Sequence, residues 1–169
     1  MVKTALVTLL LLVALSTAAQ TPPLPATYVT NRDIQGFINA LPKNAVSDNP
    51  IRVVDVGGYH VGVFGVLRPK DQLQQSAVHY TKVAEIYYIL SGNATLVTGG
   101  TIPNVDSKDG KGALHTAQGP RIDGGVGQRV GPGDAVIIPG KTPHWFSNQD
   151  GDLRYLIFRA DPENAISLK

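Results

Sequence analysis

Two histidines and one glutamate stand in segments of the chain that favour metal binding. His79 and Glu85 lie in the segment 79–92, and His144 lies in the segment 133–148. Two imidazoles and one carboxylate on β-type segments can bind a divalent transition metal and still leave coordination positions open for a substrate. The chain contains no cysteine, so nitrogen and oxygen must hold any such metal. Iron(II), manganese, zinc, nickel and cobalt all accept this donor set.

The spacing of His79 and Glu85 predicts that both side chains point to one face of a sheet. They are six residues apart, and alternate residues of a strand share a face. This holds if the turn at 82–84 preserves the alternation. His144 follows the corner at 139–140 and would enter from a strand far along the chain. If the three side chains converge, they form a small metal site inside a barrel.

The composition is that of one globular domain. The chain has 169 residues, of which 43% are hydrophobic and 17% are charged, enough for a single core. Its 18 glycines and 12 prolines favour short strands joined by tight turns. The formal net charge of +2 comes without a basic run, which makes nucleic acid a poor candidate as a partner.

The N-terminus predicts a signal peptide over residues 1–19. Lys3 supplies a positive charge, residues 5–15 are almost all apolar, and the small residues at 16–19 suit a signal peptidase. The apolar run is short for a membrane span, which needs about 20 residues. That length disfavours the alternative, an uncleaved anchor. We therefore expect a secreted or periplasmic protein that has no membrane attachment after cleavage behind Ala19.

Residues 20–50 are expected to form a Pro-rich leader followed by one short helix. Thr30 or Asn31 can cap this helix, and Pro42 ends it. Apolar residues at 34, 37, 38 and 41 follow the spacing of one buried helical face. The helix is expected to pack against the outside of a sheet.

Residues 51–160 alternate between apolar and polar with a period of two, in short segments separated by turn signals. This pattern is typical of an all-β sandwich or closed barrel. The stretch 99–127 shows little periodicity, and we expect a long loop there. Residues 161–169 are expected to form a polar tail on the surface.

The two segments that carry the candidate ligands resemble the two motifs of the cupin family. The first motif is matched by its first histidine, its glutamate and its closing glycine, here His79, Glu85 and Gly92. The second motif is matched at four places, Gly133–Asp134, Pro139, His144 and Asn148. The chain departs from the first motif at Thr81, where the family has its second histidine.

This resemblance covers residues 51 to 159 and implies a small single-domain cupin. The implied fold is all-β, a double-stranded β-helix or jelly-roll barrel, here with a short N-terminal helix. The resemblance implies that His79, Glu85 and His144 are metal ligands at the mouth of the barrel, where a small molecule would bind. It also implies a homodimer.

Residues beside the implied ligands have more than one interpretation. Thr81 either hydrogen-bonds a metal-bound water or is a plain strand residue in a barrel that has lost its metal. Tyr87 and Phe146 share strand parity with Glu85 and His144, so we expect them in the pocket wall, although core packing explains them nearly as well.

His60 and His115 are alternative ligands that would replace the missing histidine if their segments bend into the barrel. His60 lies in an expected strand and His115 in the expected loop. For both, we favour a surface or hydrogen-bonded histidine without a metal role.

Three functional classes fit the sequence. The first, which we favour, is a metal-dependent enzyme acting on a small organic molecule, of the dioxygenase, isomerase or lyase type. The second is a non-catalytic binding protein for a sugar or an aromatic metabolite, and the third is a structural barrel. No separate general base stands out, so the sequence identifies no catalytic residue beyond the implied ligands.

Overall fold

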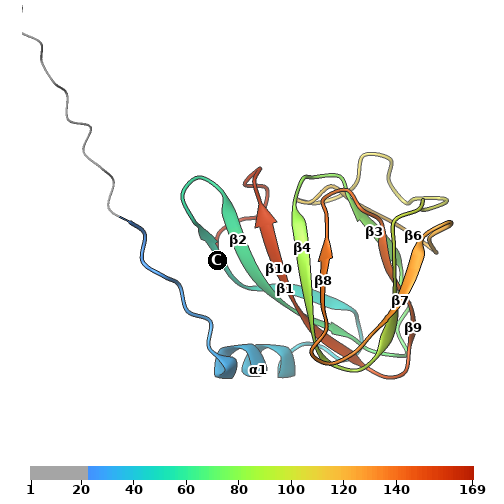
Figure 1. The fold of residues 1–169 in the computed structure, drawn as a ribbon, viewed down its shortest axis with the longest axis horizontal. Helices are drawn as coiled ribbons and strands as arrows, with labels where there is room; N and C mark the ends of the chain where they lie inside the picture. Colours follow the sequence, from blue (N-terminus) through green and yellow to red (C-terminus); the bar gives the residue numbers. More distant parts are fainter. Residues whose placement is uncertain (1–22) are drawn as a thin grey trace, which may run out of the picture.

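The computed structural model describes residues 23–169, so the predicted signal peptide at 1–19 lies outside the described residues. The described part forms one helix and ten strands (Figure 1). In chain order they are α1 (Asn31–Asn39), β1 (Ser47–Asp55), β2 (His60–Arg68), β3 (Ser76–His79), β4 (Ala84–Ser91), β5 (Ala94–Thr98), β6 (Thr116–Gly119), β7 (Val126–Val130), β8 (Ala135–Ile138), β9 (His144–Gln149) and β10 (Leu153–Asp161). No helix among residues 23–169 is long and apolar enough to cross a membrane.

The strands form two antiparallel five-stranded sheets that face each other (Figure 1). The strand order is β1-β2-β10-β4-β8 in one sheet and β6-β3-β9-β5-β7 in the other. The chain crosses between the sheets from β2 to β3, from β3 to β4, from β4 to β5, from β7 to β8, from β8 to β9 and from β9 to β10. This winding makes a double-stranded β-helix, which confirms the all-β jelly-roll barrel expected from the sequence.

The core lies between the two sheets, and strand alternation decides which residues enter it. On β4, Glu85, Tyr87 and Ile89 are buried, whereas Ile86 and Tyr88 between them are 40% and 41% exposed. The buried set points to the barrel interior because successive side chains of a strand point to opposite faces. The same alternation therefore places both the Glu85 carboxylate and the core side chains in the barrel interior.

Helix α1 covers one end of the first sheet (Figure 1). Thr30 caps it through a capping box with Asp33, in which each side chain bonds the backbone N–H of the other residue. The helix packs on β2 where Gly65 leaves room, since a Cβ at that position would meet Phe37 at 2.8 Å. The predicted short helix and its capping are confirmed.

Two segments differ from the sequence-based expectation. Strand β1 begins at Ser47 rather than at residue 51, and it accommodates Pro50 because β1 is an edge strand whose register shifts between Pro50 and Arg52. The stretch 99–127 is not one loop, because it contains β6, which pairs with β3. Four residues are too few to give a visible period of two.

The C-terminal tail is also more integrated than expected. The Asp161 carboxylate is fully buried and accepts the backbone N–H groups of Glu163 and Ile166. Lys169 then pairs with the backbone of Val53 on β1. The residues after β10 thus close the edge of the first sheet instead of forming a loose polar cap.

Candidate metal centre

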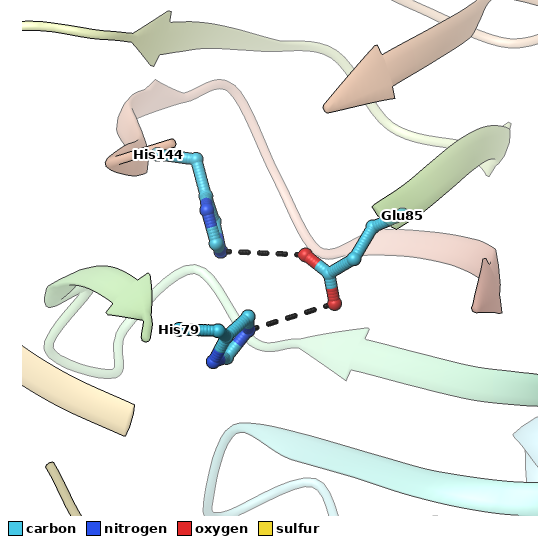
Figure 2. A group of neighbouring side chains, drawn as sticks. All are labelled: His79, Glu85 and His144. Carbon is cyan, nitrogen blue, oxygen red and sulfur yellow. Dashed lines mark ion pairs between the residues drawn. The ribbon is translucent and has the colours of Figure 1, made fainter. Parts of the chain in front are cut away.

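His79, Glu85 and His144 converge inside the barrel (Figure 2). One ligand atom from each side chain lies within 4.8 Å of the others. The Nε2 atom of His79 is 3.5 Å from Oε1 of Glu85, and Nε2 of His144 is 3.6 Å from Oε2. Ligand atoms that share a metal at about 2.1 Å lie at most about 4.2 Å apart, so small side-chain rotations suffice to enclose an ion.

The sequence-based expectation of how His79 and Glu85 come together was wrong in one respect. His79 and Glu85 do not share a face of one sheet, because β3 and β4 belong to opposite sheets. The segment 80–83 crosses between the sheets, and each side chain points inward from its own side. His144 stands beside His79, since β9 pairs with β3 through Ala77 and His144. The two histidines therefore come from one sheet and the carboxylate from the other.

Hydrogen bonds at the far side of each imidazole ring orient the histidines. His144 donates from Nδ1 to the carbonyl oxygen of Thr142 at 3.0 Å, which leaves Nε2 without a proton in the neutral ring. The Nδ1 atom of His79 is 2.8 Å from the Thr116 hydroxyl. Metal-binding histidines in proteins are commonly held in this way through the nitrogen that does not bind the metal.

Burial keeps His144 in its neutral form. The pKa of His144 is lowered, because desolvation outweighs the attraction of the Glu85 carboxylate. The unprotonated Nε2 of His144 and the carboxylate of Glu85 are both acceptors, and they face each other at 3.6 Å. A cation between them would satisfy both groups. The donor set and its protonation therefore fit a divalent metal.

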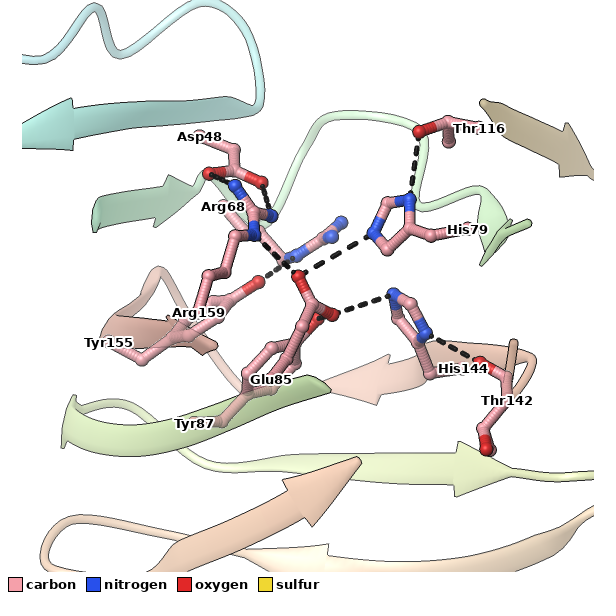
Figure 3. Close-up of polar contacts among 10 residues, drawn as sticks. All are labelled: Asp48, Arg68, His79, Glu85, Tyr87, Thr116, Thr142, His144, Tyr155 and Arg159. Carbon is pink, nitrogen blue, oxygen red and sulfur yellow. Dashed lines mark hydrogen bonds and ion pairs between the residues drawn. The ribbon is translucent and has the colours of Figure 1, made fainter. Parts of the chain in front are cut away.

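Two side chains that were not predicted as partners from the sequence, Arg159 and Tyr87, hold the Glu85 carboxylate (Figure 3). Its Oε1 accepts a hydrogen bond from Nε of Arg159 at 2.7 Å, and its Oε2 accepts one from the Tyr87 hydroxyl at 3.2 Å. Burial raises the pKa of Glu85, but the hydrogen bond of His79 and the charge of Arg159 more than reverse this, so the pKa lies far below its usual range. The carboxylate is ionised at neutral pH.

A cavity of about 750 Å³ leads to this centre. His79, His144, Tyr87 and Arg159 contribute to its lining, so a molecule in the cavity can reach both imidazoles. The remaining wall comes from the connection between α1 and β1, from the start of β1, from the end of β2, and from residues 73–77 and 111–118. The volume falls in the range of small-molecule sites, about 300–1,000 Å³.

The other candidate residues have different environments. Tyr87 lines the cavity, as expected. Phe146 does not; it is 2% exposed and packs on Tyr87 and Tyr155 in the core. Thr81 is buried outside the cavity lining, and its hydroxyl has no hydrogen-bond partner among residues 23–169.

Neither alternative histidine reaches the centre. His60 lies at the start of β2, and its Nδ1 is 2.7 Å from the carbonyl oxygen of Ile166. His115 is exposed and adopts a left-handed backbone conformation with φ of 49° next to β6. Among the described residues, only His79, Glu85 and His144 form a group able to hold a metal.

Arg159 and Asp48 complete the site but were missed in the sequence. Arg159 bonds both oxygens of Asp48, at 3.2 and 2.6 Å, and its guanidinium lies 4.2 Å from the centre of the Phe64 ring. The sequence could have indicated Arg159, because alternate residues of β10 point inward, and Arg159 follows Tyr155 and Ile157 in that alternation. Asp48 carried no comparable signal.

Comparison with known proteins gives only distant structural similarity. No family model matches the sequence, and no curated protein matches it. A solved structure of a conserved Klebsiella pneumoniae protein with a double-stranded β-helix domain is 16% identical, with 85% of this chain and 97% of that chain covered and a TM-score of 0.47.

Two further solved structures show similarity of the same order. An RmlC-like cupin family protein from Methanocaldococcus jannaschii is 15% identical over 72% of this chain and 86% of that one, with a TM-score of 0.40. The DMSP lyase DddQ from Ruegeria pomeroyi is 16% identical over 84% and 78%, with a TM-score of 0.43. The sheet order and the repeated crossings of the chain between the two sheets give this chain a double-stranded β-helix fold.

Proposed function

We propose that this protein is an exported, metal-dependent enzyme that acts on a small organic molecule, with chemistry of the dioxygenase, isomerase or lyase type. One observation carries the proposal. The neutral His144 presents an unprotonated nitrogen to the ionised Glu85 carboxylate, with His79 beside them, at the floor of an open cavity. Export rests on the signal peptide predicted from residues 1–19.

His79, Glu85 and His144 would hold the ion, which is iron, manganese, zinc, nickel or cobalt. When bound, such an ion supplies Lewis-acid polarisation or, for iron(II), dioxygen activation. The rest of the chain orients these groups. Thr142 and Thr116 hold the two imidazole rings, while Arg159 and Tyr87 hold the carboxylate.

The protein environment also controls protons at the cavity floor. Burial and the neighbouring Glu85 charge raise the pKa of Tyr87 well above its usual value, so its hydroxyl stays protonated and donates to Glu85. Three protein ligands leave positions for a substrate, and both imidazoles line the cavity from which a substrate would arrive. The wall of the cavity would exclude bulk water from one side of the bound molecule.

A non-catalytic binding protein is the second candidate, and one contact favours it. Arg159 already neutralises Glu85 through a buried 2.7 Å ion pair, so the carboxylate has a counterion without a metal. In this alternative the cavity binds a sugar or an aromatic metabolite without turnover. The cavity itself suits both candidates equally well.

Cobalt(II) substitution distinguishes the two candidates. We expect metal-free protein that is reconstituted with cobalt to show visible absorption bands, and these bands to shift on addition of azide, because azide would occupy an open coordination position. The variant His115→Asn should behave as wild type, since His115 lies outside the centre. Absence of cobalt bands would contradict the metal centre. Bands that azide does not change would contradict an open catalytic site and favour the binding protein.

A further inference from the structure

A second arginine at the cavity wall is partly buried and has no carboxylate partner. Arg68 ends β2 and lines the same cavity as His79 and His144. Its Nε donates to the Tyr155 hydroxyl at 2.9 Å, and its Nη1 donates to Oε1 of Gln74 at 3.0 Å. Both partners are neutral. The ion pairs within residues 23–169 do not include Arg68.

Arg68 keeps hydrogen-bonding capacity that faces the cavity. A guanidinium has five N–H donors, and two of those of Arg68 have partners among the described residues. Its Nη2 makes no hydrogen bond there, yet this atom is not among the fully buried polar atoms without a partner. Nη2 is thus not fully buried, and it belongs to a side chain that lines the cavity. Nη2 and the second N–H of Nη1 form the fork that a carboxylate accepts.

The neighbours of Arg68 hold this fork in place. Tyr155 is fully buried, and the guanidinium lies 5.4 Å from the centre of the Phe146 ring, in contact with the aromatic core. Figure 3 shows the guanidinium directed toward the side of the site that carries His79. A rigid guanidinium loses little side-chain entropy when it binds a ligand.

The charges at the cavity floor also favour an anion. Arg68 and Arg159 are balanced there by Glu85 and Asp48, and Arg159 is the arginine that contacts both carboxylates. A divalent metal held by His79, Glu85 and His144 would add two uncompensated positive charges. A small dicarboxylate offsets them, with one carboxylate at Arg68 and the other toward the metal centre.

We infer that Arg68 anchors the carboxylate of a small organic acid bound in the cavity beside His79 and His144. The inference deepens the proposed function and rests on it for the role of the metal. A planar carboxylate is preferred to phosphate, because Arg68 is a single fork and Lys111, the lysine of the lining, already pairs with Asp106. The wall also offers neutral amides, Asn49, Gln75 and Gln118.

Calorimetric titration with malonate tests the inference. Zinc-loaded wild type is expected to bind malonate, and to bind the neutral malonamide and inorganic phosphate at least about tenfold more weakly. Arg68→Gln should lower malonate affinity about tenfold or more while zinc content stays at the wild-type level, and Arg68→Lys should restore only part of it. Arg121→Gln is the matched control, since Arg121 is exposed and pairs with Asp123.

Three results would overturn the inference. The first is that wild type does not bind malonate. The second is that Arg68→Gln binds malonate as tightly as wild type does. The third is that wild type prefers malonamide or phosphate to malonate. Circular dichroism of Arg68→Gln verifies its fold, and Arg68→Lys preserves the charge if the glutamine variant does not fold. If zinc does not bind, the proposed metal centre fails separately. The same titration of metal-free protein then decides the role of Arg68, with wild type expected to bind malonate more tightly than Arg68→Gln.

Discussion

At the scale of single residues, Arg159 is the group on which the arrangement of the cavity floor depends. It is 4% exposed and joins the carboxylates of Glu85 and Asp48. Charges in a protein interior are tolerated when they are paired, and removal of one partner leaves the other unpaired and desolvated. Glu85 would lose its nearest counterion without Arg159, and so would be harder to keep in place as a ligand.

Replacement of Arg159 by methionine should therefore destabilise the metal-free protein. We expect a loss of about 3–5 kcal/mol in the free energy of unfolding, measured by urea denaturation with a chelator present. Arg121→Met removes an exposed arginine that pairs with Asp123, and should cost less than about 1 kcal/mol. Equal losses for the two variants would mean that the buried pair does not stabilise the fold.

Tyr155 gives a test of burial through pH. Its pKa is raised, chiefly by desolvation, against the lowering effect of Arg68. In the unfolded chain Tyr155 ionises near pH 10, whereas in the fold it stays protonated. The folded state then binds more protons than the unfolded state above that pH, so the stability contributed by Tyr155 is fully present below about pH 10 and is lost as the pH rises from there through the raised pKa of the folded state.

Urea midpoints measured from about pH 8 to about pH 11 test this sign. Wild type should lose more stability over this range than Tyr155→Phe, which has no hydroxyl to ionise. Tyr28→Phe is the control, because Tyr28 is 83% exposed, and it should follow wild type. The idea fails if Tyr155→Phe and wild type have the same dependence on pH.

The three candidate ligands were predictable residue by residue, and their supporting groups were not. His79, Glu85 and His144 stand in motifs with characteristic spacing, so residue type and local sequence identify them. Asp48 meets Arg159 across 111 residues of sequence, and no local pattern indicates such a contact. Thr81 could not be assigned either, because only the fold shows that it lies outside the cavity lining.

At the scale of elements, the turn between β4 and β5 fixes how Glu85 is presented. Gly92 lies in this turn with φ of 87°, and a Cβ there would meet the backbone oxygen of Asp152 at 2.3 Å. Both the left-handed conformation and the close approach require glycine. The closing glycine of the first motif is thus a packing requirement for the strand that carries the carboxylate.

Gly92→Ala should consequently cost more stability than Gly99→Ala. Gly99 has a similar φ of 75°, but a Cβ there meets no atom within 4 Å. We expect a loss of about 1 kcal/mol for Gly99→Ala, from backbone strain alone, and a loss of at least about 3 kcal/mol for Gly92→Ala, from strain and steric overlap together. Thermal denaturation of both variants measures the difference. Similar melting temperatures would show that the overlap with Asp152 is not present in solution.

Most strands were predictable because their alternation spans five or more residues. Strands β2, β4 and β5 lie within the segment 51–160, where the period-two alternation predicted short strands. β6 was missed, since four residues between glycine-rich turns carry no readable period. The early start of β1 was missed because Pro50 is a strand breaker everywhere except at an edge or a bulge.

At the scale of the whole molecule, the outer face of the first sheet carries a row of apolar side chains. Ile137, Ile86 and Phe158 lie on the adjacent strands β8, β4 and β10, where Ile86 pairs with both of the others, and they are 73%, 40% and 37% exposed. Contiguous exposed apolar surface is typical of an interaction site. We expect the homodimer implied by the cupin resemblance to form through this row.

Light scattering tests the dimer. Wild type should have the mass of two chains, and Ile137→Lys should shift it toward one chain, because the lysine places a charge in the interface. Val126→Lys is a matched control on β7 of the other sheet, where the side chain is also 73% exposed. A monomeric wild type would contradict the homodimer, and an unchanged Ile137→Lys would exclude this face.

We propose that the barrel holds one metal ion between its two sheets. Elemental analysis of purified protein, after reconstitution with zinc and removal of excess metal, tests it most directly. We expect about one equivalent per chain in wild type and in His115→Asn, and a large loss in His144→Asn and Glu85→Gln. Well-folded wild type without bound metal would exclude the metal centre, and His144→Asn with full occupancy would exclude His144 as a ligand.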